Sequence, residues 1–333
     1  MSYKEDFYRM LEGKTPVSDV PVSVMSFEPS EELTDTVGIM SSYNEFPAFM
    51  TGERTSSVDA WGVESTWDVN GTGPMPTPGR FILPDVTKWR DVIKAPYKLD
   101  FDFKAAAEKD MAVVQDRDYQ LVTTFGLGGN YFLQLAGFMG FEGAMLAMYD
   151  EPEAMHELLD YLCDYDVWYA TNFLENYDVD VAGFGDDNAT ELNPFISMEF
   201  FREFLLPRYD RLYKVARDHG LPISYHNCGR CEDFMDDMIN IGVKIWNCAT
   251  PVNDLLAFKQ KYENKIILEF LPRFYIGDDE ATTRQKVRDY IDLYAPGGAF
   301  VFAGGSLSMN PELNYLSDWI SDEARTYGKG FYA

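Results

Sequence analysis

The sequence predicts a (β/α)8 barrel of the TIM type with an elaborated N-terminal loop region. Short apolar runs alternate with helical patterns from residue 120 onward, which is typical of βα units around a parallel sheet. Six strand candidates lie in that part of the chain and two precede it, and eight strands in about 300 residues fit this barrel. We therefore expect a single domain over residues 1–333. An open doubly wound sheet is the alternative.

The strand candidates are β-branched and apolar runs bounded by turn residues. In chain order they are PVSVMSF (21–27), a segment near 58–64, LVTTFG (121–126), VDVAGFGDD (179–187), LPISYHNCG (221–229), VKIWNCATP (243–251), KIILEFLP (265–272) and AFVFAGG (299–305).

Helical patterns fill the intervals between the later strands, at residues 131–148, 151–177, 198–220, 231–242, 253–262 and 282–298. We expect Ser197 to cap the helix that begins at Met198, and Gly220 to end it. Pro207 lies inside that helix and should kink it. Before the first of these helices, residues 60–98 are rich in Pro, Gly and Trp, which indicates long ordered loops and not a flexible linker.

The composition limits the classes of function. The formal net charge is −27, which argues against binding nucleic acid or an anionic membrane through a broad surface. The chain has no run of eighteen apolar residues and no signal-peptide pattern at its start. Its four cysteines do not resemble a disulfide framework, so we expect a reducing, cytoplasmic environment.

Polar residues collect at the ends of the predicted strands, where a barrel places its active site. In strand order they are Asp186-Asp187-Asn188, His226-Asn227-Cys228, Asn247-Cys248, Glu269 and Gly304-Gly305-Ser306.

His226 and Cys228 are two positions apart, so on a strand they share one face and can reach one metal ion. Imidazole and thiolate ligands suit zinc. The helix that follows would favour a thiolate at Cys228 or Cys231. Two other interpretations remain open. The histidine can be buried and bonded to backbone beside an apolar cysteine, or Cys228 and Cys231 can form a redox C-x-x-C pair.

The acidic residues at the strand ends are less specific. Asp186 and Asp187 are adjacent, so one can face the cavity while the other caps a helix or meets an arginine; a simple turn is the alternative. Glu269 lies in an apolar run, and it must therefore face a cavity, a cation or a metal.

Three further features have weaker functional signals. GLGGN (126–130) is similar to a phosphate loop but lacks its lysine and full spacing, so a turn with positive φ is favoured. His156 and His219 fall on helices away from the strand ends, where structural or solvated roles are expected.

The order and spacing of several motifs resemble the uroporphyrinogen decarboxylase superfamily, and more narrowly its corrinoid-dependent methyltransferase (O-demethylase) branch. The resemblance covers nearly the whole chain. The motifs are RMLEGKTP (9–16), WGV (61–63), LPDVTKWRDVIKAP (83–96), GFGDDNAT (183–190), ISMEFFREFLLPRYDRL (196–212), HNCG (226–229), IGVKIWN (241–247) and FAGGSLS (302–308).

Two departures from this family affect the expected chemistry. The decarboxylases carry an arginine-rich stretch near the N-terminus that binds substrate carboxylates, whereas the corresponding PVSVMSFEPSEE has no arginine. Porphyrinogen decarboxylation is therefore disfavoured. The thiol methyltransferases have a third zinc ligand, a cysteine at the end of strand eight, where this chain reads AGGSLS. Glu269, Cys248 or Asp186 could replace that ligand, or zinc could be absent.

The resemblance implies transfer of a methyl group from a small methylated substrate, such as a methoxylated aromatic, to a corrinoid on a partner protein. We expect His226, Cys228 and Glu269 as zinc ligands. Asp186 and Asp187 would be catalytic, and the substrate-binding residues would be Asn188, Trp61 and Tyr225. A decarboxylase or other lyase and a non-catalytic binding protein are the alternatives. Barrels of this family often pair as homodimers, although the sequence shows no interface.

Overall fold

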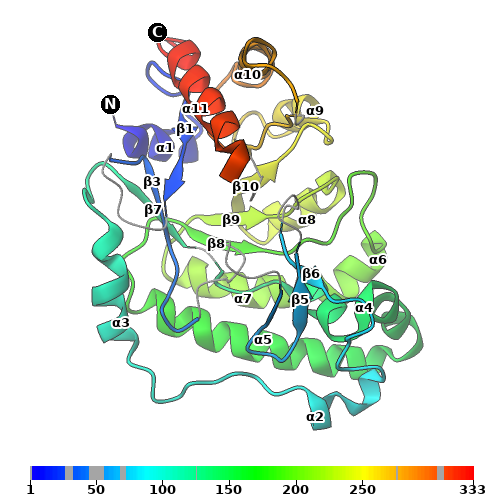
Figure 1. Ribbon diagram of the computed structural model, residues 1–333. Coiled ribbons are helices and arrows are strands. Elements are labelled where there is room, and N and C mark those ends of the chain that lie inside the picture. The colour runs from blue at the N-terminus through cyan, green and yellow to red at the C-terminus, as the bar shows by residue number, and fades with distance from the viewer. Residues whose placement is uncertain are drawn as a thin grey trace.

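Parallel strands flanked by helices form the centre of the computed structural model (Figure 1), which describes residues 2–26, 33–44, 56–67, 73–124, 126–274, 277–305 and 311–333. These strands are β1 (Val22–Ser23), β2 (Met25–Ser26), β3 (Thr36–Ile39), β7 (Leu121–Thr124), β8 (Ala182–Gly185), β9 (Ile223–His226), β10 (Val243–Ala249), β11 (Ile267–Phe270) and β12 (Phe300–Ala303).

The strand pairings confirm the predicted barrel. Six strands pair in parallel in the order β1-β12-β11-β10-β9-β8, and β2-β3-β7 form a second parallel group. β1 and β2 are consecutive parts of one extended segment interrupted at Val24. At the other junction, Thr123 bridges Val181 in parallel, and the N–H of Thr124 donates to the carbonyl of Val181 at 3.1 Å. These pairings link eight strand positions in parallel.

One predicted strand was wrong. The second barrel strand is β3, and the segment near 58–64 belongs instead to a separate antiparallel sheet of β4 (Ser56–Val58), β5 (Glu64–Thr66) and β6 (Met75–Pro76). All four residues of β3 are buried, whereas Ser56 and Val58 of β4 are exposed. Strands of a parallel barrel are buried on both faces, so the exposed segment near residue 58 cannot be one of them.

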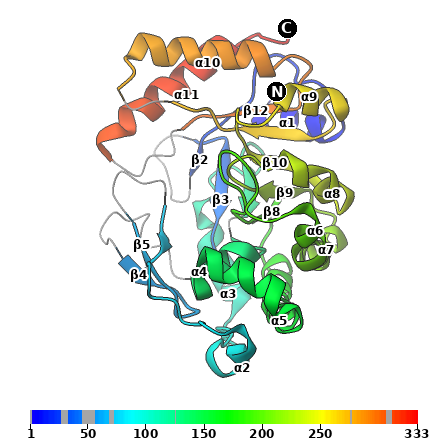
Figure 2. The ribbon, with the colours of Figure 1, turned by 90° about the vertical axis from the view of Figure 1, so that its right-hand side faces the viewer.

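Helices flank these strands on opposite sides. Figures 1 and 2 both show α10 and α11 together on one side of the strands, with α5 and α7 on the opposite side. The helices are α1 (Tyr3–Leu11), α2 (Trp89–Val92), α3 (Phe103–Asp110), α4 (Tyr131–Asp150), α5 (Pro152–Leu174), α6 (Met198–Phe200), α7 (Leu206–Asp218), α8 (Met235–Asn240), α9 (Leu255–Lys261), α10 (Glu280–Tyr294) and α11 (Asn314–Gly328).

The predicted helix signals after β8 are confirmed. The hydroxyl of Ser197 accepts the N–H of Phe200 at 3.2 Å, and Gly220 adopts a φ of 71° just after α7 ends. The kink expected at Pro207 takes the form of a π-helical segment, Phe201–Leu205, directly before α7. The wider turn accommodates the missing N–H of the proline.

The amino ends of the strands are closed by α1. Its residues Tyr3, Phe7 and Met10 join a buried cluster with one residue from each of five strand segments: Leu121, Val181, Ile245, Ile267 and Val301. The carboxylate of Asp180 anchors the helix, since it accepts from the Tyr8 hydroxyl at 2.9 Å and lies 3.0 Å from the ammonium of Lys4. The polar strand ends at the opposite end of the barrel are therefore the accessible ones.

Candidate metal centre at the carboxyl ends of the strands

Three neighbouring strands carry a row of polar side chains. His226 on β9 is in register with Asn247 on β10, and Asn247 is in register with Glu269 on β11. Nδ1 of His226 lies 2.5 Å from Oδ1 of Asn247, and Nδ2 of Asn247 donates to the Glu269 carboxylate at 2.7 Å. Strand register alone thus places an imidazole, an amide and a carboxylate side by side.

The sulfur of Cys228 faces the same imidazole from the other side. Its Sγ lies 3.5 Å from Nε2 of His226, and its backbone N–H donates to Oδ1 of Asp187 at 3.0 Å. That same oxygen lies 3.8 Å from Nε2, and the His226 and Asp187 side chains are 40% and 43% exposed. The predicted sharing of one face by His226 and Cys228 is therefore observed, and the site is open to solvent.

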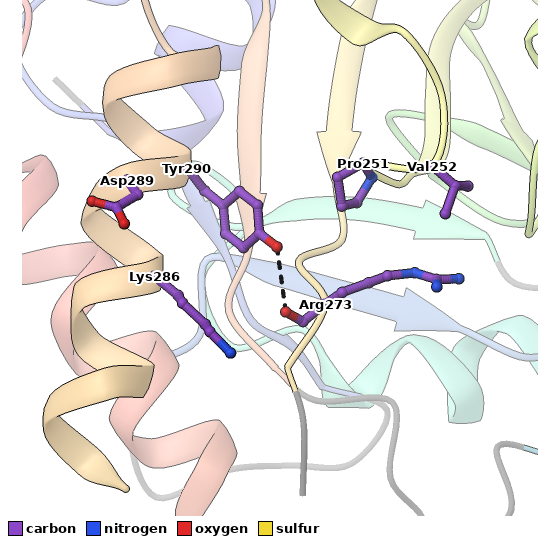
Figure 3. A pocket seen from close by; sticks show the side chains of 6 residues that line it. All are labelled: Pro251, Val252, Arg273, Lys286, Asp289 and Tyr290. Atoms are coloured by element: carbon purple, nitrogen blue, oxygen red, sulfur yellow. Dashed lines mark hydrogen bonds between the residues drawn. The ribbon is translucent and has the colours of Figure 1, made fainter. Parts of the chain in front are cut away.

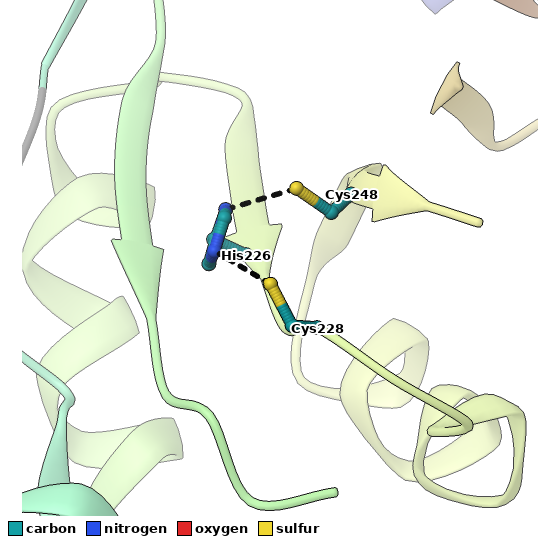
Figure 4. A group of neighbouring side chains, drawn as sticks. All are labelled: His226, Cys228 and Cys248. Atoms are coloured by element: carbon teal, nitrogen blue, oxygen red, sulfur yellow. Dashed lines mark hydrogen bonds between the residues drawn. The ribbon is translucent and has the colours of Figure 1, made fainter. Parts of the chain in front are cut away.

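Cys248 supplies a second sulfur because β10 is irregular at this point. On a regular strand Asn247 and Cys248 would point to opposite faces. The pairing of β10 with β11 shifts register between Asn247 and Ala249, and such a bulge re-aims a side chain. As a result, Sγ of Cys248 lies 3.6 Å from Nδ1 of His226 (Figure 4).

These three side chains have a donor set that fits zinc. One ligand atom from each of His226, Cys228 and Cys248 lies within 4.8 Å of the others, and in the part of the chain that the structure describes no further group of three or more His, Cys, Asp or Glu side chains meets this criterion. One imidazole and two thiolates are ligands that zinc accepts in tetrahedral sites. The exposed side of the site leaves room for a fourth ligand, as catalytic zinc sites require.

The electrostatics of the group favour a cation. The hydrogen bond with Cys248 and burial raise the pKa of the Cys228 thiol above its ordinary range. Burial alone would lower the pKa of His226, but Cys228 and the Asp187 carboxylate together raise it to about 9. Two neighbouring thiols cannot both ionise without added positive charge, and a divalent metal would supply that charge.

Glu269 is linked to this group only through Asn247, so the third member that the structure brings together is Cys248 and not the predicted Glu269. Burial raises the pKa of the Glu269 carboxyl. Cys248 is one of the three residues, with Glu269 and Asp186, that the sequence offers as a replacement for the missing third ligand.

Asp186 lies behind the strand ends and caps a helix. Its carboxylate accepts the N–H groups of Phe132 and Leu133, in the first turn of α4, at 2.6 and 3.1 Å. The hydroxyl of Tyr209 also donates to it, at 2.7 Å. Burial raises the pKa of Asp186 to about 7, although these three donors act in the opposite direction. Of the two adjacent aspartates, Asp187 is thus the one beside His226.

Asn188 and Tyr225, predicted to contact substrate, are fully buried on the same inner side. Nδ2 of Asn227 donates to Oδ1 of Asn188 and to the hydroxyl of Tyr225, each at 2.6 Å. Trp61 is elsewhere, packed edge-on against Tyr165 of α5 with ring centroids 5.1 Å apart. The structure does not bring these three residues to the metal group.

The redox alternative finds no support in the cysteine geometry. Cys231 is buried, and its thiol donates to the carbonyl of Asn227 at 3.5 Å, while Cys228 faces His226. All four cysteines are free.

The GLGGN loop is filled by a carboxylate. Oδ2 of Asp166 accepts the N–H of Gly129 at 2.8 Å, and a Cβ added at Gly128 would lie 2.6 Å from Cγ of Asp166. The carboxylate thus takes the place that a bound phosphate would need.

The other two histidines contact neighbouring residues away from the metal group. Nε2 of His156 lies 3.4 Å from Glu203, and Nδ1 of His219 lies 2.8 Å from the carbonyl of Val215.

A separate cavity of about 420 Å³ lies close to the ends of β10 and β11 (Figure 3). The hydroxyl of Tyr290 donates to the carbonyl of Arg273 at its edge, at 3.4 Å. The guanidinium of Arg273 pairs with Glu191, in the segment after β8, at 2.8 Å. The cavity is lined by Pro251, Val252, Arg273, Lys286, Asp289 and Tyr290, so none of the three metal-type donors lines it.

Comparisons with known proteins agree with the fold. A family model described as uroporphyrinogen decarboxylase (URO-D) matches residues 120–308, more than half of the chain. A solved methyltransferase from Methanosarcina mazei aligns over 100% of both chains, with a TM-score of 0.63 and 15% sequence identity. At this identity the likeness concerns the fold alone.

Other solved structures align more weakly. An endo-β-1,4-xylanase from Gloeophyllum trabeum has a TM-score of 0.40 at 11% identity, over 62% of this chain and 70% of its own. A xylose isomerase-like TIM barrel protein from Mycobacterium smegmatis has a TM-score of 0.31 at 11% identity, over 65% and 78%. These scores are too low to support an argument. A search of curated proteins gave no match. In the described part of the chain, none of the helices has the length and apolar character needed to cross a bilayer.

Proposed function

Since the chain belongs to the uroporphyrinogen decarboxylase family, we propose that it is a methyltransferase of that family. Its substrate would be a small methylated compound, in the first instance a methoxylated aromatic, and the methyl group would pass to a corrinoid carried by a partner protein. The shared fold with the Methanosarcina mazei methyltransferase supports this assignment. The absence of arginine from PVSVMSFEPSEE supports methyl transfer over decarboxylation of a substrate that is bound through its carboxylates.

The observation that carries the proposal is the grouping of His226, Cys228 and Cys248 at the open end of the barrel. We assign these three side chains as zinc ligands. When bound, zinc would supply Lewis-acid stabilisation of the oxygen that loses the methyl group. Phenolate is a poor leaving group, so this oxygen is where stabilisation lowers the barrier most.

We assign to Asp187 the handling of the proton at that oxygen. In demethylation of an aryl methyl ether the methyl–oxygen bond breaks, the oxygen keeps the electron pair, and a proton then neutralises it. Asp187 has a carboxylate oxygen 3.8 Å from Nε2 of His226 and a side chain that solvent reaches. Its hydrogen bond from the Cys228 N–H fixes the direction of the carboxylate, as a positioned proton donor or acceptor requires.

Methyl transfer can be tested by incubating the zinc-loaded protein with a reduced corrinoid protein and a panel of methoxylated and N-methylated compounds. The expected result is a substrate-dependent change of the cobalt spectrum from the cobalt(I) to the methylcobalt form. His226→Ala and Cys228→Ser should abolish it. The proposal would be contradicted if the wild-type protein binds zinc but the cobalt spectrum stays unchanged with every compound and every corrinoid protein tested.

The description of the family suggests a second candidate function, that of a decarboxylase or other lyase that acts without a metal. Release of carbon dioxide in the absence of a corrinoid acceptor, undiminished in Cys228→Ser, would favour that function. Tight binding of an aromatic compound without turnover under either condition would instead favour a non-catalytic binding role.

A further inference from the structure

Asn247 lies between two groups whose hydrogen-bonding roles are different. On one side Glu269 offers carboxylate oxygens, which in the ionised state only accept hydrogen bonds. On the other side is Nδ1 of His226, 2.5 Å from the Asn247 amide. The three residues are register partners on β9, β10 and β11, so the strand pairing holds the row in place.

The carboxylate of Glu269 dictates which way the amide of Asn247 faces. Only the NH2 end of the amide can donate to a carboxylate, and Nδ2 is the atom 2.7 Å from Glu269. The amide oxygen must then face His226. Because that oxygen only accepts, Nδ1 of a neutral His226 must carry the ring hydrogen.

We propose that Asn247, oriented by Glu269, is a positioning residue that keeps the hydrogen of neutral His226 on Nδ1 and leaves the lone pair of Nε2 free to bind a metal. Nε2 is also the ring nitrogen that faces Cys228, at 3.5 Å, and Asp187, at 3.8 Å, whereas Sγ of Cys248 lies 3.6 Å from Nδ1. The metal part of this inference rests on the proposed function; the position of the ring hydrogen does not. Partners of this kind orient metal-bound histidines, and their loss typically lowers metal affinity about 10–100-fold.

Two substitutions separate positioning from packing. Asn247→Leu keeps a similar volume but removes both hydrogen bonds, so the ring hydrogen should distribute between Nδ1 and Nε2. Glu269→Gln keeps the shape and removes the charge that fixes the amide, so a smaller effect is expected. Asn176→Leu, at an exposed position after α5, serves as the control for replacing asparagine.

The first readout needs no metal. The chain has three histidines, so 15N-labelled imidazoles give few NMR signals, and those of His226 are identified by their loss in His226→Gln. With the ring neutral, wild type and Asn176→Leu should show the hydrogen on Nδ1, and Asn247→Leu should show a mixture or the Nε2 form.

The second readout is the zinc dissociation constant, measured by competition with a chromophoric chelator. We expect about a 10–100-fold weakening in Asn247→Leu, and a smaller loss in Glu269→Gln. The proposal is overturned if the wild-type hydrogen is on Nε2, or if Asn247→Leu leaves both the tautomer and the zinc affinity as in wild type. If no zinc binds to wild type, the metal assignment fails, while the NMR result still decides the role of Asn247.

Discussion

The Asp187 carboxylate accepts the backbone N–H of Cys228 at 3.0 Å, and so ties the chain after β8 to the chain after β9. The bond holds Cys228 where its sulfur faces Nε2 of His226. Asp187 therefore has two separable properties, an oxygen that holds the loop and a charge beside the proposed metal.

Replacing Asp187 by Asn should separate these two properties. The amide oxygen can accept the same N–H, so zinc content should stay near the wild-type value. The proton-handling group is lost, and kcat for methyl transfer should fall about 100-fold or more. Asp178→Asn, at an exposed position paired with Arg117, should leave both quantities unchanged. A kcat for Asp187→Asn within threefold of wild type would remove Asp187 from the chemistry.

Gly185 should be needed for the position of His226. An added Cβ would lie 2.9 Å from Cβ and 3.1 Å from the carbonyl oxygen of His226. We expect Gly185→Ala to displace β9, lower the free energy of unfolding by about 1–3 kcal/mol, and weaken zinc binding at least tenfold. Gly73→Ala, where a Cβ meets no atom within 4 Å, is the matched control. Zinc affinity and urea unfolding of both variants check this; equal zinc affinity in the two would argue against it.

Asp180 should stabilise the closed end of the barrel in a pH-dependent way. Burial opposes its charge, but Arg117, Lys4 and the N–H of Val122 lower its pKa overall. A lowered pKa in the folded state adds stability above the unfolded pKa, and that stability is lost as the pH falls through the folded value.

The Asp180→Asn variant tests this linkage. It should lose about 2 kcal/mol of unfolding free energy at pH 7. This is less than the loss from breaking a fully buried ion pair, because Arg117 and Lys4 are partly in solvent. The difference from wild type should shrink as the pH falls below about 4, as measured by urea unfolding from pH 7 to pH 3. A difference independent of pH would mean that the charge of Asp180 contributes nothing.

Lys259 should be a structural lysine of the outer layer. Its ammonium donates to the carbonyls of Tyr294, the last residue of α10, and of Pro296 and Gly298 just after it, at 2.5, 3.0 and 2.7 Å. Lys259→Met would leave these carbonyls without that donor, and we expect a loss of about 2–4 kcal/mol in unfolding free energy with zinc affinity unchanged. Lys261, on the same helix as Lys259, forms an exposed ion pair with Asp236 of α8. Lys261→Met removes this pair and should cost less than about 1 kcal/mol. Equal thermal unfolding of the two variants would refute this role.

Much of the barrel was predictable because six of its strands are short apolar runs, buried on both faces and separated by helices. The second strand, TVGI (36–39), was not, since it precedes the part of the chain where apolar runs alternate with helical patterns. It pairs with β2 and with β7, and β7 follows it by more than 80 residues, so no local pattern reveals its place in the sheet. The exposed strand near residue 58 offered a similar local signal.

The pair His226 and Cys228 followed from strand periodicity, but Cys248 did not, because a bulge in β10 turns it toward the ring. The sequence also left open which of the adjacent residues Asp186 and Asp187 faces the site. The hydrogen bonds of Asp186 to the start of α4 depend on how that helix packs, which no local pattern reveals. Register between strands, and not sequence spacing, made Asn247 the neighbour of both His226 and Glu269.

Zinc K-edge X-ray absorption of the metal-loaded protein tests the central claim most directly, because it counts the sulfur atoms bound to the metal. The account predicts two sulfurs per zinc at about 2.3 Å with nitrogen at about 2.0–2.1 Å, and one sulfur in Cys248→Ser. A wild-type spectrum with a single sulfur, or with none, would contradict the assignment of His226, Cys228 and Cys248 as one metal centre.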